Sequence, residues 1–305
     1  MPGFLSAPKL YTDRDSSTDR DLCAVSNRQA ALSGDSQTMT THRWPFIGSE
    51  ALRDGVVANK HRLRTRHRAL FPDVYLPIGS SASLAQRTAG AWLWTRRRGV
   101  VAGLTASALL GARWIADDIP VELIWANARP PDGIVTRRDR LLPDEFQLLG
   151  GIPVTTPART AFDLGRTRRS DEAVSRLDAL GNVTRFDRSA VERLARRHTG
   201  SPGLPQLRWA LDLSDSGSES PRETWLRLLL IRAGFPRPRT QIAVHDDFGD
   251  PCYFLDMGWE ETMVAVEYDG DHHRSFRKEL CAPSSSGTAA GPTFASSPET
   301  APAIS

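Results

Sequence analysis

The stretch Met263-Val-Ala-Val-Glu-Tyr-Asp-Gly-Asp-His-His273 decides the fold that we expect for the C-terminal part of the chain. Its valines and tyrosine are typical of a buried strand. Glu267 and Asp269 stand two residues apart, so they share one face of that strand. Two adjacent carboxylates repel each other unless a cation lies between them, and Mg²⁺ or Mn²⁺ accepts such oxygen ligands. The stretch therefore predicts a divalent-cation site.

A helix and two further strands precede this stretch and give the order αβββ. Ser220, Pro221 and Glu223 form a strong helix start, because Ser caps the helix, Pro fits its first turn and Glu completes a capping box. Asp256 places a third carboxylate on the middle strand. Residues 220–280 are therefore expected to form one domain. Its strands are predicted over residues 241–245, 253–257 and 262–268.

The pattern of residues 41–117 predicts a winged helix-turn-helix, with a helix, a turn, a basic helix and an extended segment. Residues 41–100 hold eleven Arg and Lys against three acidic residues, a net charge of +8 that favours a polyanion as partner. The cations recur at every second position, a spacing that wraps around a helix. A solvated basic helix is the alternative interpretation. The candidate DNA-binding residues are Lys60, Arg62, Arg64, Arg66 and Arg68.

The composition of the remaining ranges predicts whether each forms a domain, a linker or a disordered segment. Residues 118–213 contain β-forming and helical segments, which predict a central α+β domain. Residues 214–219 consist of Ser, Asp, Gly and Glu and predict a linker. The two ends, residues 1–40 and 281–305, are polar or small-residue segments without periodicity, so we predict that they are disordered. The whole chain is expected to combine α+β and α/β parts.

The overall composition is that of an ordinary soluble protein. Of 305 residues, 40% are hydrophobic and 25% are charged, and no apolar run is long enough to span a membrane. The three cysteines, Cys23, Cys252 and Cys281, have neither metal-site nor disulfide spacing. We therefore expect reduced cysteines, a cytoplasmic location and no membrane partner.

Two sets of residues resemble known families. The segment from Gly151 to Leu164, GIPVTTPARTAFDL, together with the basic N-terminal region, resembles actinobacterial AbiEi-like antitoxins. The block at 220–224, Asp256 and the block at 266–270 resemble an endonuclease-like domain often fused behind that region. This domain is similar to very-short-patch-repair endonucleases and to the PD-(D/E)XK superfamily. The resemblance implies a restriction-endonuclease-like core that cleaves phosphodiester bonds with Mg²⁺ or Mn²⁺.

The resemblance also implies roles for individual residues. Glu223 matches the acid of the first helix, Asp256 the Asp of the PD motif and Glu267 the acid of the (D/E)XK motif. Asp269 stands where the motif has Lys, so it is expected to add a metal ligand beside Asp256 and Glu267. His272 or His273 is then expected to act as the general base, because the ordinary pKa of histidine lies near working pH.

The chain departs from the family in a second respect. The core lacks its last helix and strand, and the tail over residues 281–305 takes their place, so we expect a truncated or frameshifted gene. The interpretations left open are a metal-dependent endonuclease, one inactivated by this loss, and a non-catalytic DNA-binding transcriptional regulator of the antitoxin type. DNA is the expected partner in each, with a toxin or a second copy of the chain beside it. Structural roles also remain open, as a capping acid for Glu223 and as an ion-pair partner for Arg159.

Overall fold

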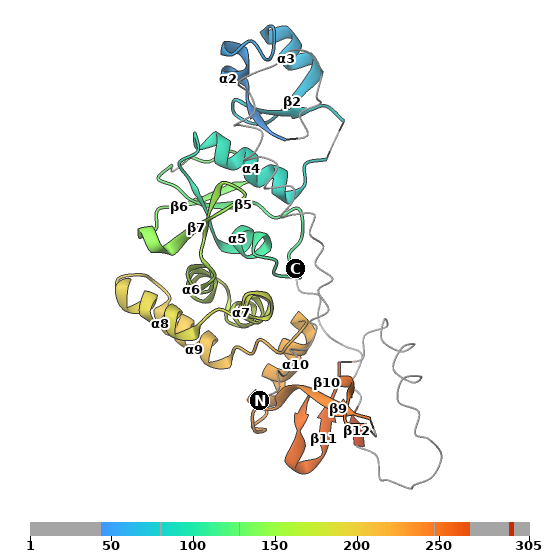
Figure 1. Cartoon of the computed structure of the whole chain (residues 1–305). Coiled ribbons are helices and arrows are strands. Elements are labelled where there is room, and N and C mark those ends of the chain that lie inside the picture. Colours follow the sequence, from blue (N-terminus) through green and yellow to red (C-terminus); the bar gives the residue numbers. More distant parts are fainter. Residues whose placement is uncertain (1–43, 80, 128, 247, 269–292, 296–305) are drawn as a thin grey trace, which may run out of the picture. The chain divides into compact units, whose positions relative to one another are not determined.

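The computed structural model describes residues 44–79, 81–127, 129–246, 248–268 and 293–295. Within this part, the chain has a mixed α+β fold with three sheets (Figure 1). It divides into two compact units. The first contains the described residues up to Val101 together with Leu123–Val154, and the second contains Ala102–Glu122 and the described residues from Thr155 onward. The predicted boundary at residue 118 therefore falls inside a segment of the second unit.

The first unit begins with the element order expected for its basic region. Two short helices, α2 (Gly48–Arg53) and α3 (Lys60–Arg66), are followed by a hairpin of two strands, β2 (His67–Phe71) and β3 (Val74–Pro77). Strand β1 (Phe46–Ile47) joins the hairpin in the antiparallel order β1-β3-β2, and α4 (Leu84–Trp94) packs on all three strands. The buried core between α2 and α3 consists of Ala51, Val57 and Leu63.

A five-stranded sheet has the order β6-β5-β4-β8-β7. Its short central strand, β4, pairs antiparallel with β5 and parallel with β8. The sheet is thus mixed, and it accounts for the β-forming segments of the range predicted as central α+β. A 3-10 turn, η1 (Pro143–Glu145), leads into its edge strand β7. The strands are β4 (Val100–Val101), β5 (Val121–Ile124), β6 (Ile134–Arg137), β7 (Phe146–Leu149) and β8 (Ile152–Thr155).

The second unit is built on packed helices. Helix α6 lies at the centre of the group, because it contacts α5, α7, α8 and α9. Arg159 of α6 is 1% exposed and pairs with Asp163 at 3.2 Å, so its structural role is confirmed. Burial of an unpaired guanidinium would cost several kcal/mol, about 3–5 on removal of one partner. The helices are α5 (Gly103–Leu109), α6 (Pro157–Thr167), α7 (Ser170–Thr184), α8 (Arg188–Arg197), α9 (Leu204–Leu213) and α10 (Pro221–Arg232).

The same unit ends in a sheet of the order β12-β11-β10-β9. Strands β9 (Arg239–His245), β10 (Pro251–Trp259) and β11 (Val264–Val266) are antiparallel neighbours that follow α10, as the αβββ order predicts. A short turn, η2 (Glu260–Thr262), joins the last two. Strand β12 (Thr293–Ala295) pairs parallel with β11 and corrects the expectation of a wholly disordered tail. A sheet edge presents unpaired backbone groups, which a further strand can satisfy.

The structure bears on the expected redox state of the cysteines and on the expected absence of a membrane span. Cys252 on β10 is disulfide-bonded, so the expectation of reduced cysteines is wrong for this residue. The spacing along the sequence did not indicate it, because disulfide geometry depends on distance in the fold. Among the helices of the described ranges, none is long and apolar enough to cross a membrane.

Candidate nucleic-acid interface and C-terminal carboxylates

Helix α3 is fixed at its start and on one side. The Asn59 side chain accepts a hydrogen bond from the Arg62 backbone N–H at 2.9 Å, which caps the helix. Leu63 is its one buried residue and packs in the cluster with Ala51 and Val57. The other side chains of α3 are exposed. The helix therefore presents most of its circumference to solvent.

The candidate DNA-binding residues divide into two groups. Lys60, Arg62, Arg64 and Arg66 lie on α3 and are exposed, and within the described ranges none of the four forms an ion pair. Arg68 lies on β2 instead and is half-buried. No acidic residue occurs in α3, so its four positive charges are not neutralised within the helix. Such a surface attracts polyanions, and this attraction weakens with salt.

Asp73, in the turn between β2 and β3, holds the start of α2. Its backbone φ is +61°, and its carboxylate accepts bonds from the Ser49 N–H at 2.9 Å and the Ser49 hydroxyl at 2.6 Å. Arg96 donates a further bond at 2.8 Å. Burial alone would raise the pKa of Asp73, but these bonds outweigh it and lower the pKa. Sequence reasoning missed this residue, because its partners are more than twenty residues away along the chain.

Glu223 occupies the capping position expected of it. Its carboxylate accepts bonds from the Ser220 hydroxyl and from the Glu219 N–H, both at 2.8 Å, and its own N–H donates to Ser220 Oγ at 3.2 Å. Burial raises the pKa of Glu223, and repulsion from the Asp256 carboxylate adds to this. Ser220 therefore caps α10 as predicted, but the Glu223 carboxylate accepts from the Glu219 N–H and not from the Ser220 N–H of a capping box. Both of its oxygens already have donors.

The remaining C-terminal candidates are only partly described. Asp256 is buried on β10, and its Oδ2 accepts a bond from the Tyr268 N–H at 2.8 Å. Glu267 follows β11 and is half-buried. Among the described residues, no three His, Cys, Asp or Glu side chains are grouped to hold a metal ion. The Mg²⁺ or Mn²⁺ site stays a prediction. Three candidates lie outside the described residues: Asp269, His272 and His273.

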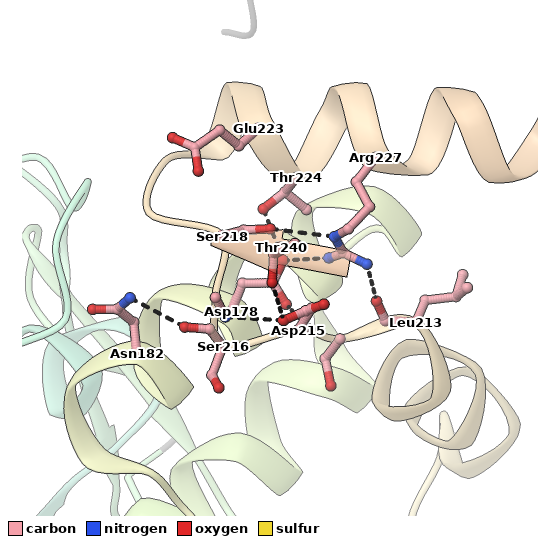
Figure 2. Close-up of polar contacts among 12 residues, drawn as sticks. Asp178, Asn182, Leu213, Asp215, Ser216, Ser218, Glu223, Thr224, Arg227 and Thr240 are labelled. Carbon is pink, nitrogen blue, oxygen red and sulfur yellow. Dashed lines mark hydrogen bonds and ion pairs between the residues drawn. The ribbon is translucent and has the colours of Figure 1, made fainter. Parts of the chain in front are cut away.

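A buried ion pair connects α7 to α10, as Figure 2 shows. Asp178 and Arg227 are 1% and 0% exposed, and Arg227 Nη2 lies 2.6 Å from Asp178 Oδ2. The guanidinium also donates to Ser218 Oγ at 3.2 Å and to the Leu213 carbonyl at 2.5 Å, and Thr224 donates its hydroxyl to Asp178 at 2.8 Å. Burial raises the pKa of Asp178 to about 6, against the lowering effect of Arg227 and of the hydrogen bonds.

The same network holds residues 214–219, which we call the strap. The Asp215 N–H donates to Asp178 Oδ1 at 2.7 Å, and the Thr240 hydroxyl of β9 donates to Asp215 Oδ1 at 3.0 Å. The segment is therefore not the free linker that its composition predicted, because its polar groups bond to the helices and the sheet beside it (Figure 2). Two more side chains donate to strap carbonyls: Asn182 to Ser216 at 3.1 Å and Trp114 to Glu219 at 2.8 Å.

One part of the chain is similar to a known protein family. Residues 99–209 match the family model of the AbiEi antitoxin C-terminal domain. The chain is also 32% identical, over 124 residues, to uncharacterized proteins of Mycobacterium tuberculosis strains CDC 1551 / Oshkosh and H37Rv. These alignments cover 41% of this chain and 45% of each relative, so the chain spans less than half the length of the relatives it matches. No solved structure matches. The matched family range ends before α10, so it gives no support to the endonuclease-like resemblance of the C-terminal sheet.

Proposed function

We propose that this chain is a DNA-binding transcriptional regulator of the AbiEi antitoxin type, and that α3 with the hairpin β2–β3 contacts the DNA. The observation that carries the proposal is the set of four exposed cations on α3, which form no ion pair within the described residues. The helix-turn-helix-hairpin order supports a helix placed for DNA contact. The antitoxin domain matched by residues 99–209 supports the regulator rather than the endonuclease.

The charge on α3 predicts the strength of the salt effect. Each phosphate contact releases condensed counterions, which gives a slope of about −0.9 per contact in a plot of log affinity against log salt. Four contacts from α3 give a slope of roughly −3.6. Fluorescence anisotropy of a labelled 30-base-pair duplex with the full chain, measured over a series of NaCl concentrations, gives this slope directly.

The critical variant removes the four cations together, as K60A/R62A/R64A/R66A. The matched control removes four exposed cations from the helical unit, as R185A/R193A/R196A/R208A, and so changes the net charge by the same amount. We expect the α3 variant to lose binding and most of the slope, while the control keeps both. Equal losses in the two variants would show that total charge, and not α3, determines binding.

The antitoxin class also implies a target. An antitoxin acts against a toxin, so the proposal includes repression of a toxin gene as the biological outcome. Helix-turn-helix proteins commonly bind two-fold DNA sites as dimers. A second copy of this chain on the same DNA site is therefore the partner that we propose, and band-shift titration on duplexes with one or two half-sites measures it.

A metal-dependent hydrolase is the second candidate function. One observation favours it: Glu223 of α10 and Asp256 of β10 lie close enough for repulsion between their carboxylates to raise the pKa of Glu223. A divalent ion would relieve that repulsion. Glu267 directly precedes Tyr268, whose N–H donates to Asp256, and so would be a further ligand of the ion. The ion would then activate water for attack on a phosphodiester. The assay is plasmid cleavage with Mg²⁺ or Mn²⁺. Cleavage that persists in Asp256→Ala would refute this assignment.

A further inference from the structure

The exposed circumference of α3 is divided into three stripes. Successive residues of an α-helix are about 100° apart around its axis. Leu63 points into the core of the first unit, and the positions about 180° from it are His61 and Thr65. Both side chains are exposed. A ridge of His61 and Thr65 therefore forms the outermost line of the helix.

The cations form one row on each side of this ridge. Lys60 and Arg64 are four residues apart and lie about 120° and 80° to one side of the ridge. Arg66 and Arg62 lie about 120° and 80° to its other side. The cations that alternate along the sequence therefore form two basic rows on the helix. The ridge of His61 and Thr65 lies between these rows.

From this arrangement we infer that His61 and Thr65 read base edges in the DNA major groove, while the two rows contact the phosphates of the two strands. The inference rests on the proposed DNA-binding function and adds which residues set sequence preference. A helix with its side chains is about 10–12 Å across and the major groove is about 12 Å wide, so phosphates lie on both sides of an inserted helix. Rows on both sides of the ridge match that geometry.

The two ridge residues offer different chemistry to a base. The Thr65 hydroxyl donates to the His61 carbonyl at 3.0 Å, so its hydrogen is used within the helix. The hydroxyl oxygen can then only accept a hydrogen bond, and the exposed Thr65 methyl group suits the methyl group of thymine. The His61 imidazole carries a donor and an acceptor, which suit a purine edge. The expected preference is thus for a thymine next to a purine.

The test is selection from a duplex library with twelve randomised positions, with the full chain as wild type, Thr65→Ser, Thr65→Val and His61→Ala. Thr65→Ser removes the methyl group, and Thr65→Val keeps a methyl group and removes the hydroxyl. We expect Thr65→Ser to lose the preference at one thymine, Thr65→Val to keep it, and His61→Ala to lose the preference at a neighbouring purine. Replacing that thymine with deoxyuracil removes one buried methyl group, so it should weaken wild-type binding about 4-fold and leave Thr65→Ser unaffected.

Each outcome decides the matter. Affinity for unselected DNA should remain within about twofold in all four proteins, because the two rows are intact. If wild type and the ridge variants select the same sequence, or if wild type binds DNA without any preference, the inference is wrong while the proposed function stands. If wild type binds no DNA at all, the proposed function fails first.

Discussion

Arg227→Met removes the charge that balances Asp178 in the interior of the second unit. Both side chains are at most 1% exposed, so water does not replace the lost partner. Removal of one member of such a pair costs about 3–5 kcal/mol, a large share of the roughly 5–15 kcal/mol that stabilise a folded domain. For a unit of this size the midpoint of thermal unfolding should fall by about 10 °C. Met fills part of the volume of Arg, which limits the contribution of a cavity.

The assay is thermal unfolding at pH 8, followed by circular dichroism, where Asp178 with a pKa of about 6 is ionised in the wild type. The matched control is Arg232→Met on the same helix, because Arg232 pairs with Asp171 at 2.8 Å on the surface. An exposed pair contributes about 0–1 kcal/mol, so the control should change little. The double variant D178N/R227M should recover most of the loss, since neither charge remains buried.

The pH dependence of this loss has a definite sign. Without Arg227 the pKa of Asp178 rises further, so the folded variant binds a proton over a pH range where the unfolded chain does not. The deficit of Arg227→Met relative to wild type should therefore shrink as pH falls from 8 to 5. A loss below about 1 kcal/mol at pH 8, or a double variant no more stable than the single one, would refute the reasoning.

Two more substitutions test local features of the two units. Asp73→Ala should destabilise the first unit by about 1–2 kcal/mol, because α2 loses its capping acceptor, with urea unfolding as the measurement. The lowered pKa of Asp73 means that the same stabilisation is present above its ordinary pKa and is lost as pH falls below about 4, so wild type and variant should converge in acid. Gly103→Ala should cost about 1–3 kcal/mol in thermal unfolding, because φ is +59° and a Cβ would lie 2.1 Å from Glu122 Oε2. A Gly103→Ala protein as stable as wild type would contradict this.

Local signals in the sequence were sufficient for parts of the structure that depend on near neighbours. The capping acid Glu223 and the cap Asn59 were recognisable because each acts within three residues of its partner. The αβββ order followed from apolar periodicity and turn residues. The basic region gave the order of α2, α3 and the hairpin for the same reason.

Features that depend on distant partners could not be predicted. Asp178 and Arg227 are 49 residues apart, and nothing in either local pattern pairs them. The strap had the composition of a linker, because Ser, Asp and Gly serve equally well in a mobile chain and in a densely hydrogen-bonded one. The two rows on α3 became visible only when Leu63 fixed which way the helix faces.

The buried ion pair also limits where a gene for this protein can recombine. Asp178 lies in the family-matched range, 99–209, while Arg227 lies beyond it on α10. A crossover in the codons of the strap would join one parent's Asp178 to another parent's residue at position 227. Where that residue is not a cation, the product would have a buried charge without its partner. A crossover after codon 232 keeps both residues together. Exchange of C-terminal sheets among relatives is therefore expected to preserve α10 with the helices before it.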